Sequence, residues 1–394
     1  MKNENLVPKV RFKGFSDPWE QRKLKWFLRV SKLKNIDGIF DKNSVLSVSG
    51  EFGVVNQIAF QGRSFAGKSI LNYGILDHND VVYTKSPLKS NPYGIIKTNL
   101  GKAGVVSTLY AVYAPLKTVY SPILGYYFNL DTRVNNYLRP LVNKGAKNDM
   151  KVRDEAVLEG KVCIPDSIET QKRICNLFSL IDNLIAANED KLEQLKTLKK
   201  LMMQKIFSQE WRFKGFTDPW EQRKLGDITA ITMGQSPSSA NYTNNPEDHI
   251  LVQGNADMKN GYVLPRVWTT QITKKAEAGD LILSVRAPVG DIGKTDYDVV
   301  LGRGVASIKG NEFIYQTLKY MNDIGKWTRF STGSTFESIN SADIKDARIG
   351  YPKLNEQNLI GNILEKMDSI IAANEDKLNQ LKELKKYLMQ NMFV

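Results

Sequence analysis

The chain carries an internal duplication, and this feature constrains its fold more than any other. The segment RFKGFSDPWEQRKL at residues 11–24 recurs as RFKGFTDPWEQRKL at residues 212–225. A second segment, at residues 181–207, recurs at residues 367–393 with the shared string AANEDKL. The repeat is far too long for a solenoid, whose units have about 20 to 45 residues. The sequence therefore predicts one unit, a domain followed by a helix, that is present twice.

The second repeated segment is predicted to be a long helix. Apolar residues recur at spacings of three and four in both copies, and neither proline nor glycine interrupts them. The pattern begins near Gln171 and Gln357, so each helix should have roughly 30 to 35 residues and a length of roughly 45 to 55 Å. Because a long helix with a narrow apolar stripe usually pairs with another helix, we expect the two copies to form an antiparallel coiled coil.

Ten positions of the apolar stripe are expected to form this helix pair. They are Ile181, Leu184, Asn188, Leu195, Met202, Met367, Ile370, Asn374, Leu381 and Leu388. Two of them are asparagines, and a buried polar pair would fix the register of the helices. Asparagines at the edge of the stripe would instead lie in water, and the sequence leaves both interpretations open.

The segments between these landmarks differ in sequence but share an order of features. Each has an apolar run that leads to a basic residue and a proline, then a Gly-Val-x-Ser string, a helical stretch and a loop of small residues. In the first copy these lie at 80–87, 104–107, 124–141 and 144–148, and in the second at 280–288, 304–307, 312–326 and 331–335. Short β-branched and aromatic runs between turns predict strands, so each segment should be a sheet-rich α+β domain.

The predicted fold class is therefore α+β, with two sheet-rich domains, two long antiparallel helices between them and a pseudo-twofold internal repeat. We expect four segments, at residues 1–165, 166–211, 212–352 and 353–394, which alternate between domain and helix.

Composition narrows the function. Lys and Arg number 55 against 42 Asp and Glu, and the net charge of +13 favours a polyanionic partner. Cys163 and Cys175 are the two cysteines, and we expect them in the core of a protein from a reducing compartment, without a disulfide framework or zinc site. With two histidines as well, no catalytic set and no metal site are predicted. The sequence has no apolar run of about 18 residues and no signal-peptide pattern, so we expect a cytoplasmic protein.

One motif suggests a different class of protein. Residues 62–69 (GRSFAGKS) fit the phosphate-loop pattern, in which Lys68 would contact phosphates and Ser69 a magnesium ion. A phosphate loop needs a buried strand before it and a long helix after it, whereas here a turn at Gly74 follows too soon. A basic turn is the other interpretation of this segment.

Taken together, the motifs resemble the specificity subunit of type I restriction–modification systems over essentially the whole chain. The resemblance rests on the DPWEQRKL cassette, on Thr-Gln or Glu-Gln before each helix, and on the repeated helix itself. Further strings resemble one class of target-recognition domain: GQSP at 234–237, SVRAPVG at 284–290, LGRG at 301–304 and STGSTF at 331–336. The first domain fits more loosely, because it has KGAK at 144–147 where the second has STGS.

The resemblance implies a non-catalytic protein that reads DNA. In this family two target-recognition domains each read half of a split site in double-stranded DNA, and the helical regions dock two methyltransferase subunits. Restriction and translocase subunits complete the enzyme. S-adenosylmethionine, ATP and magnesium would be bound by those partners, and this chain would bind no cofactor. Because the two domains differ in sequence, the site should be asymmetric.

Basic and amide side chains near strand ends are the candidate DNA contacts, since Arg, Gln and Asn can read base edges and Lys can position phosphates. In the first domain these are Lys85, Lys89, Asn91, Lys144, Lys147 and Asn148. In the second domain they are Gln235, Ser236, Tyr242, Gln253, Asn255, Arg286, Arg303 and Thr335.

Two other functions remain open at this point. A coiled-coil adaptor that joins two proteins without a DNA role would explain the helices and the repeat, but it leaves the net charge of +13 unexplained. A nucleotide hydrolase would use the phosphate loop at 62–69, and Lys68→Ala would abolish its activity.

Overall fold

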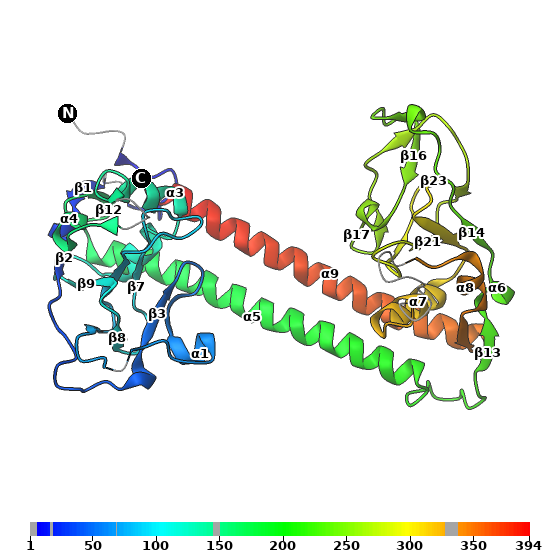
Figure 1. The fold of residues 1–394 in the computed structure, drawn as a ribbon, viewed down its shortest axis with the longest axis horizontal. Coiled ribbons are helices and arrows are strands. Elements are labelled where there is room, and N and C mark those ends of the chain that lie inside the picture. Colours follow the sequence, from blue (N-terminus) through cyan, green and yellow to red (C-terminus); the bar gives the residue numbers. More distant parts are fainter. Residues whose placement is uncertain (1–5, 16–18, 68, 145–149, 328–337) are drawn as a thin grey trace. The chain divides into compact units, whose positions relative to one another are not determined.

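The computed structural model describes residues 6–15, 19–67, 69–144, 150–327 and 338–394 (Figure 1). The chain divides into two compact units: unit 1 comprises Met1–Glu189 and Lys377–Val394, and unit 2 comprises Asp190–Asp376. The division falls inside both long helices, α5 (Ile168–Phe207) and α9 (Leu354–Asn391). Each unit therefore consists of one sheet-rich domain and a part of each long helix.

The long helices have 40 and 38 residues, which is more than predicted. They begin before Gln171 and Gln357, whose side chains turn back to donate to the carbonyls of Pro165 (2.7 Å) and Pro352 (2.8 Å). Both glutamines are buried. The predicted start was about one turn late, because these glutamines end the first turn of each helix and bond to a proline two or three residues before the helix begins.

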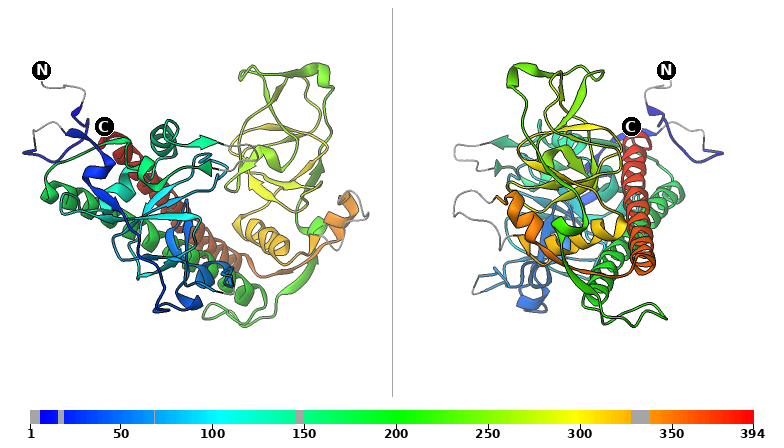
Figure 2. Two further views of the ribbon diagram at one scale, coloured as in Figure 1. Left: turned by 60° about the vertical axis from the view of Figure 1, so that its left-hand side comes forward. Right: turned by 90° about the vertical axis from the view of Figure 1, so that its right-hand side faces the viewer.

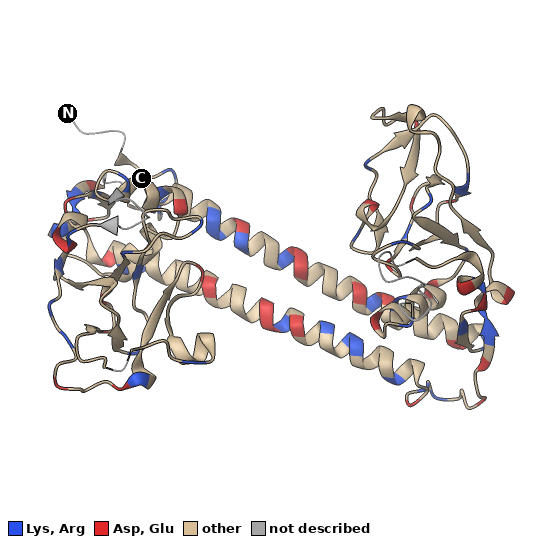
Figure 3. Cartoon of the chain, in the orientation of Figure 1, with Lys and Arg blue, Asp and Glu red and all other residues tan. Residues whose placement is uncertain are grey.

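Ion pairs between the two helices show that they run antiparallel within each unit. Their N–O distances are 2.5 to 2.6 Å, and they join Asp182–Lys385 and Glu189–Lys382 in unit 1, and Lys196–Glu375 and Lys199–Asp368 in unit 2. Residue numbers rise along one helix as they fall along the other, which confirms the predicted antiparallel pair. Lys, Arg, Asp and Glu are spread along both helices (Figure 3).

The main sheets of the two units have the same strand order, although their sequences differ. All neighbouring pairs in this shared part are antiparallel. In unit 1 the order is β2 (Leu28–Val30), β9 (Tyr110–Pro115), β6 (Val81–Thr84) and β7 (Ile96–Thr98). In unit 2 it is β14 (Ile231–Met233), β24 (Val305–Ile308), β21 (Leu281–Ser284) and β22 (Ile292–Lys294), extended by β18 (Tyr262–Val263) and β17 (Met258–Lys259).

The smaller sheets also correspond. In unit 2, β23 (Val299–Leu301) lies between antiparallel β20 (Lys275–Ala276) and parallel β16 (His249–Val252), and β19 (Trp268–Thr269) and β15 (Tyr242–Thr243) follow. In unit 1, β8 (Gly104–Val106) pairs antiparallel with β5 (Gly74–Leu76), a parallel bridge joins Val45 to Val105, and β3 (Leu46–Ser49) pairs with β4 (Gly53–Asn56). Strand β8 is thus the counterpart of β23. The expected match between residues 104–107 and 304–307 was wrong, because the first string forms β8 and the second leads into β24.

The predicted apolar runs after Asp80 and Asp280 form β6 and β21, and the same turn precedes both. The Asp80 amide donates to the carbonyl of Asp77 (3.1 Å), and the Asp280 amide donates to that of Glu277 (3.0 Å). Each aspartate carboxylate accepts a hydrogen bond from the amide of that same earlier residue, at 3.1 and 3.0 Å. The two domains therefore share local structure at positions where the sequences differ.

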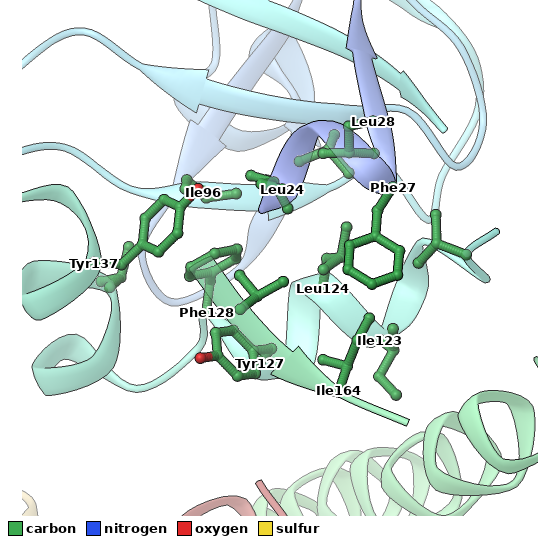
Figure 4. Close-up of a cluster of buried hydrophobic side chains, with 14 of the residues drawn as sticks. Leu24, Phe27, Leu28, Ile96, Ile123, Leu124, Tyr127, Phe128, Tyr137 and Ile164 are labelled. Atoms are coloured by element: carbon green, nitrogen blue, oxygen red, sulfur yellow. The ribbon is translucent and has the colours of Figure 1, made fainter. Parts of the chain in front are cut away.

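Each domain packs helices against its main sheet and against the repeated cassette. Unit 1 uses α2 (Pro122–Tyr127) and α3 (Asp131–Leu138), and Figure 4 shows Ile123, Leu124 and Phe128 within its core. Unit 2 uses α7 (Glu312–Asp323), which lies beneath the six-stranded sheet (Figure 2). The cassettes form β1 (Glu20–Lys23), paired with β12 (Lys161–Ile164), and β13 (Glu221–Lys224), paired with β25 (Arg348–Tyr351).

The ends of the long helices are held by the tryptophans of the cassettes. Trp19 contacts Phe393 edge to face at 5.9 Å between ring centroids, and Trp220 contacts Phe207 in the same way at 6.4 Å. These pairs occupy equivalent positions in the repeat, so the internal repeat of the sequence is also present in the local structure of each unit. Both cysteines are buried and free, as expected for core residues.

Short elements complete the described part of the chain. The helices are α1 (Gln57–Gln61), α4 (Asp154–Val157), α6 (Leu225–Ile228) and α8 (Ser341–Asp346), and the remaining strands are β10 (Asn143–Lys144) and β11 (Met150–Lys151). None of the helices in this part is long and apolar enough to span a membrane.

Candidate nucleic-acid interface

Four loops of unit 2 meet at one edge of its sheets and enclose a cleft of about 540 Å³. They follow β14, β16 and β21, and the fourth joins β23 to β24. The cleft is lined by Ser236, Pro237, Ser238, Ser239, Tyr242, Gln253, Gly254, Asn255, Ser284, Arg286, Ala287, Arg303 and Gly304. Hydroxyl, amide and guanidinium groups dominate this lining, so the cleft suits a polar, anionic ligand.

Glycines allow the backbones of the four cleft loops to lie in direct contact with one another. A Cβ atom on Gly234 would lie 2.0 Å from the carbonyl oxygen of Gly302, and one on Gly304 would lie 2.0 Å from that of Gln253. Real Cβ atoms do not come so near to backbone atoms. The glycines of the strings at 234–237 and 301–304 are therefore required by the packing of the cleft floor.

Hydrogen bonds between the loops fix their backbones. The amide of Arg303 donates to Ser236 Oγ (3.0 Å), and the amide of Gly302 donates to the carbonyl of Val252 (2.7 Å). The hydroxyl of Ser284 donates to the carbonyls of Arg286 (3.0 Å) and Pro288 (2.9 Å). The loops thus hold one another, and the exposed side chains project from a fixed frame.

The charges around the cleft are unevenly distributed. Arg286 and Arg303 are exposed, whereas the buried carboxylate of Asp257 accepts the amides of Gln253 (2.7 Å) and Gly254 (3.3 Å). Asp291 accepts from Asn255 at 3.3 Å. Arg266 lies 3.8 Å from Asp257, whereas Arg286 and Arg303 are exposed, so their guanidinium groups are available to an anionic ligand at the mouth of the cleft.

Six of the eight DNA contacts predicted in the second domain line this cleft: Ser236, Tyr242, Gln253, Asn255, Arg286 and Arg303. Gln235 is exposed beside it, and its amide donates to the carbonyl of Leu301 (2.8 Å). Thr335 lies outside the described residues. Sequence reasoning missed the serines at 238, 239 and 284, although the serine-rich string after Pro237 is a signal that could have indicated them.

The residues predicted in the first domain do not gather in this way. Lys85 forms an ion pair with Asp154 at 2.6 Å, and Asn91 is buried and donates to Asp131 at 3.0 Å. Lys89 is exposed. Lys144 lies in β10, and the two remaining predictions, Lys147 and Asn148, fall outside the described residues. Their role as DNA contacts stays a prediction.

The structure around the phosphate-loop string does not fit nucleotide binding. Lys68 is outside the described residues, and Ser69 does not begin a helix but precedes β5. The strand–loop–helix arrangement that places amides around a phosphate is therefore missing at this string. In the described part of the chain no group of three or more His, Cys, Asp or Glu could hold a metal ion.

The helix-pairing predictions are met to different degrees. Ile181 and Asn188 are buried, whereas Leu184 and Ile370 are exposed; Leu195, Met202, Met367, Asn374, Leu381 and Leu388 are partly buried. Asn188 donates to the carbonyl of Leu184 (2.6 Å), and Asn374 donates to that of Ile370 (2.7 Å). Both side chains therefore bond within their own helix.

The sequence is similar to that of type I restriction enzyme specificity subunits. Residues 217–383 match the family described as the type I restriction modification DNA specificity domain. The putative type I restriction enzyme MjaX specificity subunit of Methanocaldococcus jannaschii is 31% identical over 265 residues, which cover 63% of this chain and 62% of that protein. The MjaVIII specificity subunit of the same organism is 23% identical over 264 residues, 60% of this chain and 62% of that one. The chain thus spans less than two thirds of the length of these relatives.

Solved structures agree in fold. The type I restriction–modification S subunit from M. genitalium superposes with a TM-score of 0.65 at 15% identity, covering 98% of this chain and 99% of that one. A chain from a study of assembly and conformational transition in a type I R-M system gives a TM-score of 0.58 at 19% identity, covering 94% and 96%.

The matched segment assigns a type I restriction modification DNA specificity domain to residues 217–383. The fold of the chain is shared with the S subunit of a type I restriction–modification system.

Proposed function

We propose that this chain is the non-catalytic DNA-recognition subunit of a type I restriction–modification complex and reads a bipartite, asymmetric DNA site. The cleft of unit 2 carries this proposal, because it holds Arg286 and Arg303 beside amide and hydroxyl groups on a rigid backbone. Arginine pairs with guanine, and asparagine or glutamine with adenine, through two hydrogen bonds in the major groove. The net charge of +13 supplies the attraction to phosphates that accompanies such reading.

Residues 1–165 and 212–352 are the two target-recognition domains in this proposal, and residues 166–211 and 353–394 are the helical spacers. Their shared strand order supports two heads that do the same task, and their different sequences support two different half-sites. Besides the cleft residues, we propose Lys85, Lys89, Lys144 and Lys147 as phosphate contacts of the first domain.

The repeated cassettes and helices present equivalent surfaces, which suits two copies of one partner. We propose that these partners are two methyltransferase subunits and that restriction and translocase subunits join them. The partners would bind S-adenosylmethionine, ATP and magnesium. The complex would act on DNA in the cytoplasm, at the nucleoid.

The two alternative functions have less support. A nucleotide hydrolase lacks the helix that a phosphate loop requires after Ser69. An adaptor without a DNA role leaves both the net charge and the arginine-lined cleft without a purpose.

A genome-wide map of methylated adenines, with the gene present and deleted, tests the proposal. We expect one split, asymmetric motif to lose methylation on deletion. An unchanged map, together with duplex binding that does not weaken as salt rises, would leave the adaptor as the better explanation.

A further inference from the structure

The first domain has a counterpart of the cleft loops that its sequence does not reveal. In unit 2 the amide of Val285, just after β21, donates to the carbonyl of Gly304 (2.9 Å). In unit 1 the amide of Lys85, just after β6, donates to the carbonyl of Leu109 (3.0 Å). The strand registers agree, because Ser284 faces Val305 and Thr84 faces Tyr110.

The turn at residues 107–109, between β8 and β9, is therefore the counterpart of residues 302–304, between β23 and β24. In unit 2 this turn presents Arg303 to the cleft. In unit 1 it presents Thr108, which is exposed, and Leu109, which is 61% exposed. Ser107 holds the turn, since its carbonyl accepts the amide of Tyr110 at 3.0 Å.

A second loop brings another apolar side chain to the same edge. Strand β2 runs antiparallel to β9, so the carboxyl end of β2 and the amino end of β9 lie at one edge of the sheet. Leu33 follows β2 and is 59% exposed. Its carbonyl accepts the backbone amide of Ile75 in β5, and in unit 2 the carbonyl of Gln235 accepts the side-chain hydroxyl of Thr273, which comes shortly before β20.

The edge thus differs between the units: unit 2 presents Arg303, whereas unit 1 presents the exposed Leu33 and Leu109 beside Thr108, with the exposed Lys32 and Lys34 on either side of Leu33. The basic residue that ends the apolar run of unit 1, Lys85, is held by Asp154 at 2.6 Å, and Asn91 is buried against Asp131. Leu33 and Leu109 offer apolar surface at this edge, and its coverage by an apolar group of a ligand would be favourable.

We propose that Thr108 and Leu109, with Leu33, are specificity-determining residues for the first half-site and that they read it mainly through apolar contact with thymine methyl groups. In the major groove the C5 methyl of thymine is the apolar feature that distinguishes a base pair, and a threonine can bond to base edges or touch that methyl. The first half-site then depends on A·T pairs, whereas the second depends on the hydrogen-bonding groups of unit 2. This inference rests on the proposed function.

The test uses the full chain in its host, with the methylated adenines mapped for Leu109→Ala, Thr108→Ala and the parent protein. Leu100→Ala is the matched control, because Leu100 is 55% exposed in the same domain but lies outside these two loops. We expect Leu109→Ala to lower methylation of the parent motif on the order of tenfold and to relax A·T positions of the first half-site, with the second unchanged. The control should match the parent.

Each outcome decides the inference. If Leu109→Ala and Thr108→Ala both match the parent map, or if the second half-site changes instead, the assignment of these residues is wrong while the proposed function stands. A parent map without any split motif removes the proposed function itself. Loss of methylation without a change in base preference, in variants that melt at the parent temperature, also counts against specificity determination.

Discussion

Arg286 and Arg303 are the two exposed cations of the unit 2 cleft, and their backbones are fixed by neighbouring loops. We expect Arg303→Ala to remove one to two orders of magnitude of discrimination at one base pair of the second half-site, about 1 to 3 kcal/mol, because a bidentate arginine–guanine contact has that strength. Binding assays on duplexes that vary one base at a time measure this change.

Arg223→Ala provides the control for that prediction. Arg223 is an exposed arginine of the same unit, paired with Glu221 on β13 and outside the cleft. If both variants weaken all duplexes equally, Arg303 contacts a phosphate and reads no base.

Asp80 tests the shared turn of the two domains. Burial raises the pKa of Asp80 to about 6, and the neighbouring carboxylate of Asp77 adds to this effect. The folded chain therefore binds more protons than the unfolded chain between the two pKa values, so stability falls as pH rises from about 4 to about 6. Asp80→Asn should raise stability at pH 8 by about 1 to 2 kcal/mol and have little effect at pH 4. Thermal unfolding at both values measures this.

Asp280→Asn is the matched comparison, because Asp280 occupies the same turn but lies 3.2 Å from Lys309 Nζ. Its replacement removes an ion pair and should not stabilise the protein at pH 8. If both variants gained similar stability at pH 8, the burial that raises the pKa of Asp80 could not be the cause of the gain.

Residues of the second domain were easier to predict than those of the first for a physical reason. The cleft of unit 2 needs Gly234 and Gly304 for close backbone contact, and such glycines mark loops in a sequence. The matching turn of unit 1 contains Thr108 and Leu109 instead. Because leucine usually lies in a core, its sequence pattern does not suggest a surface that reads DNA.

At the scale of the elements, periodicity predicted the long helices but not which of their faces the domains cover. Leu184 and Leu198 belong to the apolar stripe yet are exposed, whereas Lys199 is 5% exposed. Helix α7 packs beside Lys199 and brings Gln316 and Lys319 to the same carboxylate, that of Asp368. The apolar stripe of α5 cannot show that α7, more than a hundred residues later in the chain, packs against it.

Asp368 on α9 connects this helix to α5 and α7 through its carboxylate. Its carboxylate accepts from Lys199 at 2.5 Å, from Gln316 at 2.8 Å and from Lys319 at 3.3 Å. Burial and the second lysine lower the pKa of Lys199 to about 8. Asp368→Asn removes the carboxylate that the buried Lys199 shares with the partly exposed Lys319, and it should destabilise unit 2 by about 3 kcal/mol. Urea unfolding, with hydrogen exchange of α7, measures the loss.

Glu375→Gln is the control for this prediction, because Glu375 pairs with Lys196 across the same helices but both side chains are more exposed. Its effect should stay below about 1 kcal/mol, as for other surface ion pairs. If both variants lost the same free energy of unfolding, the ion pair of Asp368 beside α7 would stabilise the protein no more than an exposed ion pair does.

At the scale of the whole molecule, the duplication predicted two similar units, the β-branched runs predicted the α+β class, and the apolar stripes predicted the antiparallel helices. The duplication did not predict that the two domains share a strand order, because strand pairing depends on contacts between residues far apart in the sequence. The sheets β2-β9-β6-β7 and β14-β24-β21-β22 have the same arrangement built from different side chains. The backbone is thus duplicated, while the loops at its reading edge have diverged.

Because the two domains share a strand order but differ in their loops, we expect that one domain can be exchanged without a change in the other. Residues 226–350 lie between the second cassette and the second long helix, and they contain the whole unit 2 cleft. Replacing them with the matching segment of another family member should change the second half-site and leave the first unchanged, because Thr108, Leu109 and Leu33 remain in place. Maps of methylated adenines from the parent and the exchanged protein measure both half-sites at once.

The same exchange also tests whether each domain reads DNA independently. The cassette Trp220 and the buried Glu356 that accepts its indole N–H (3.1 Å) both lie outside the exchanged segment, so the packing between cassette and helix is preserved. A map in which both half-sites change would mean that the two domains do not act separately. A changed second half-site beside an unchanged first one would mean that each domain carries its own specificity.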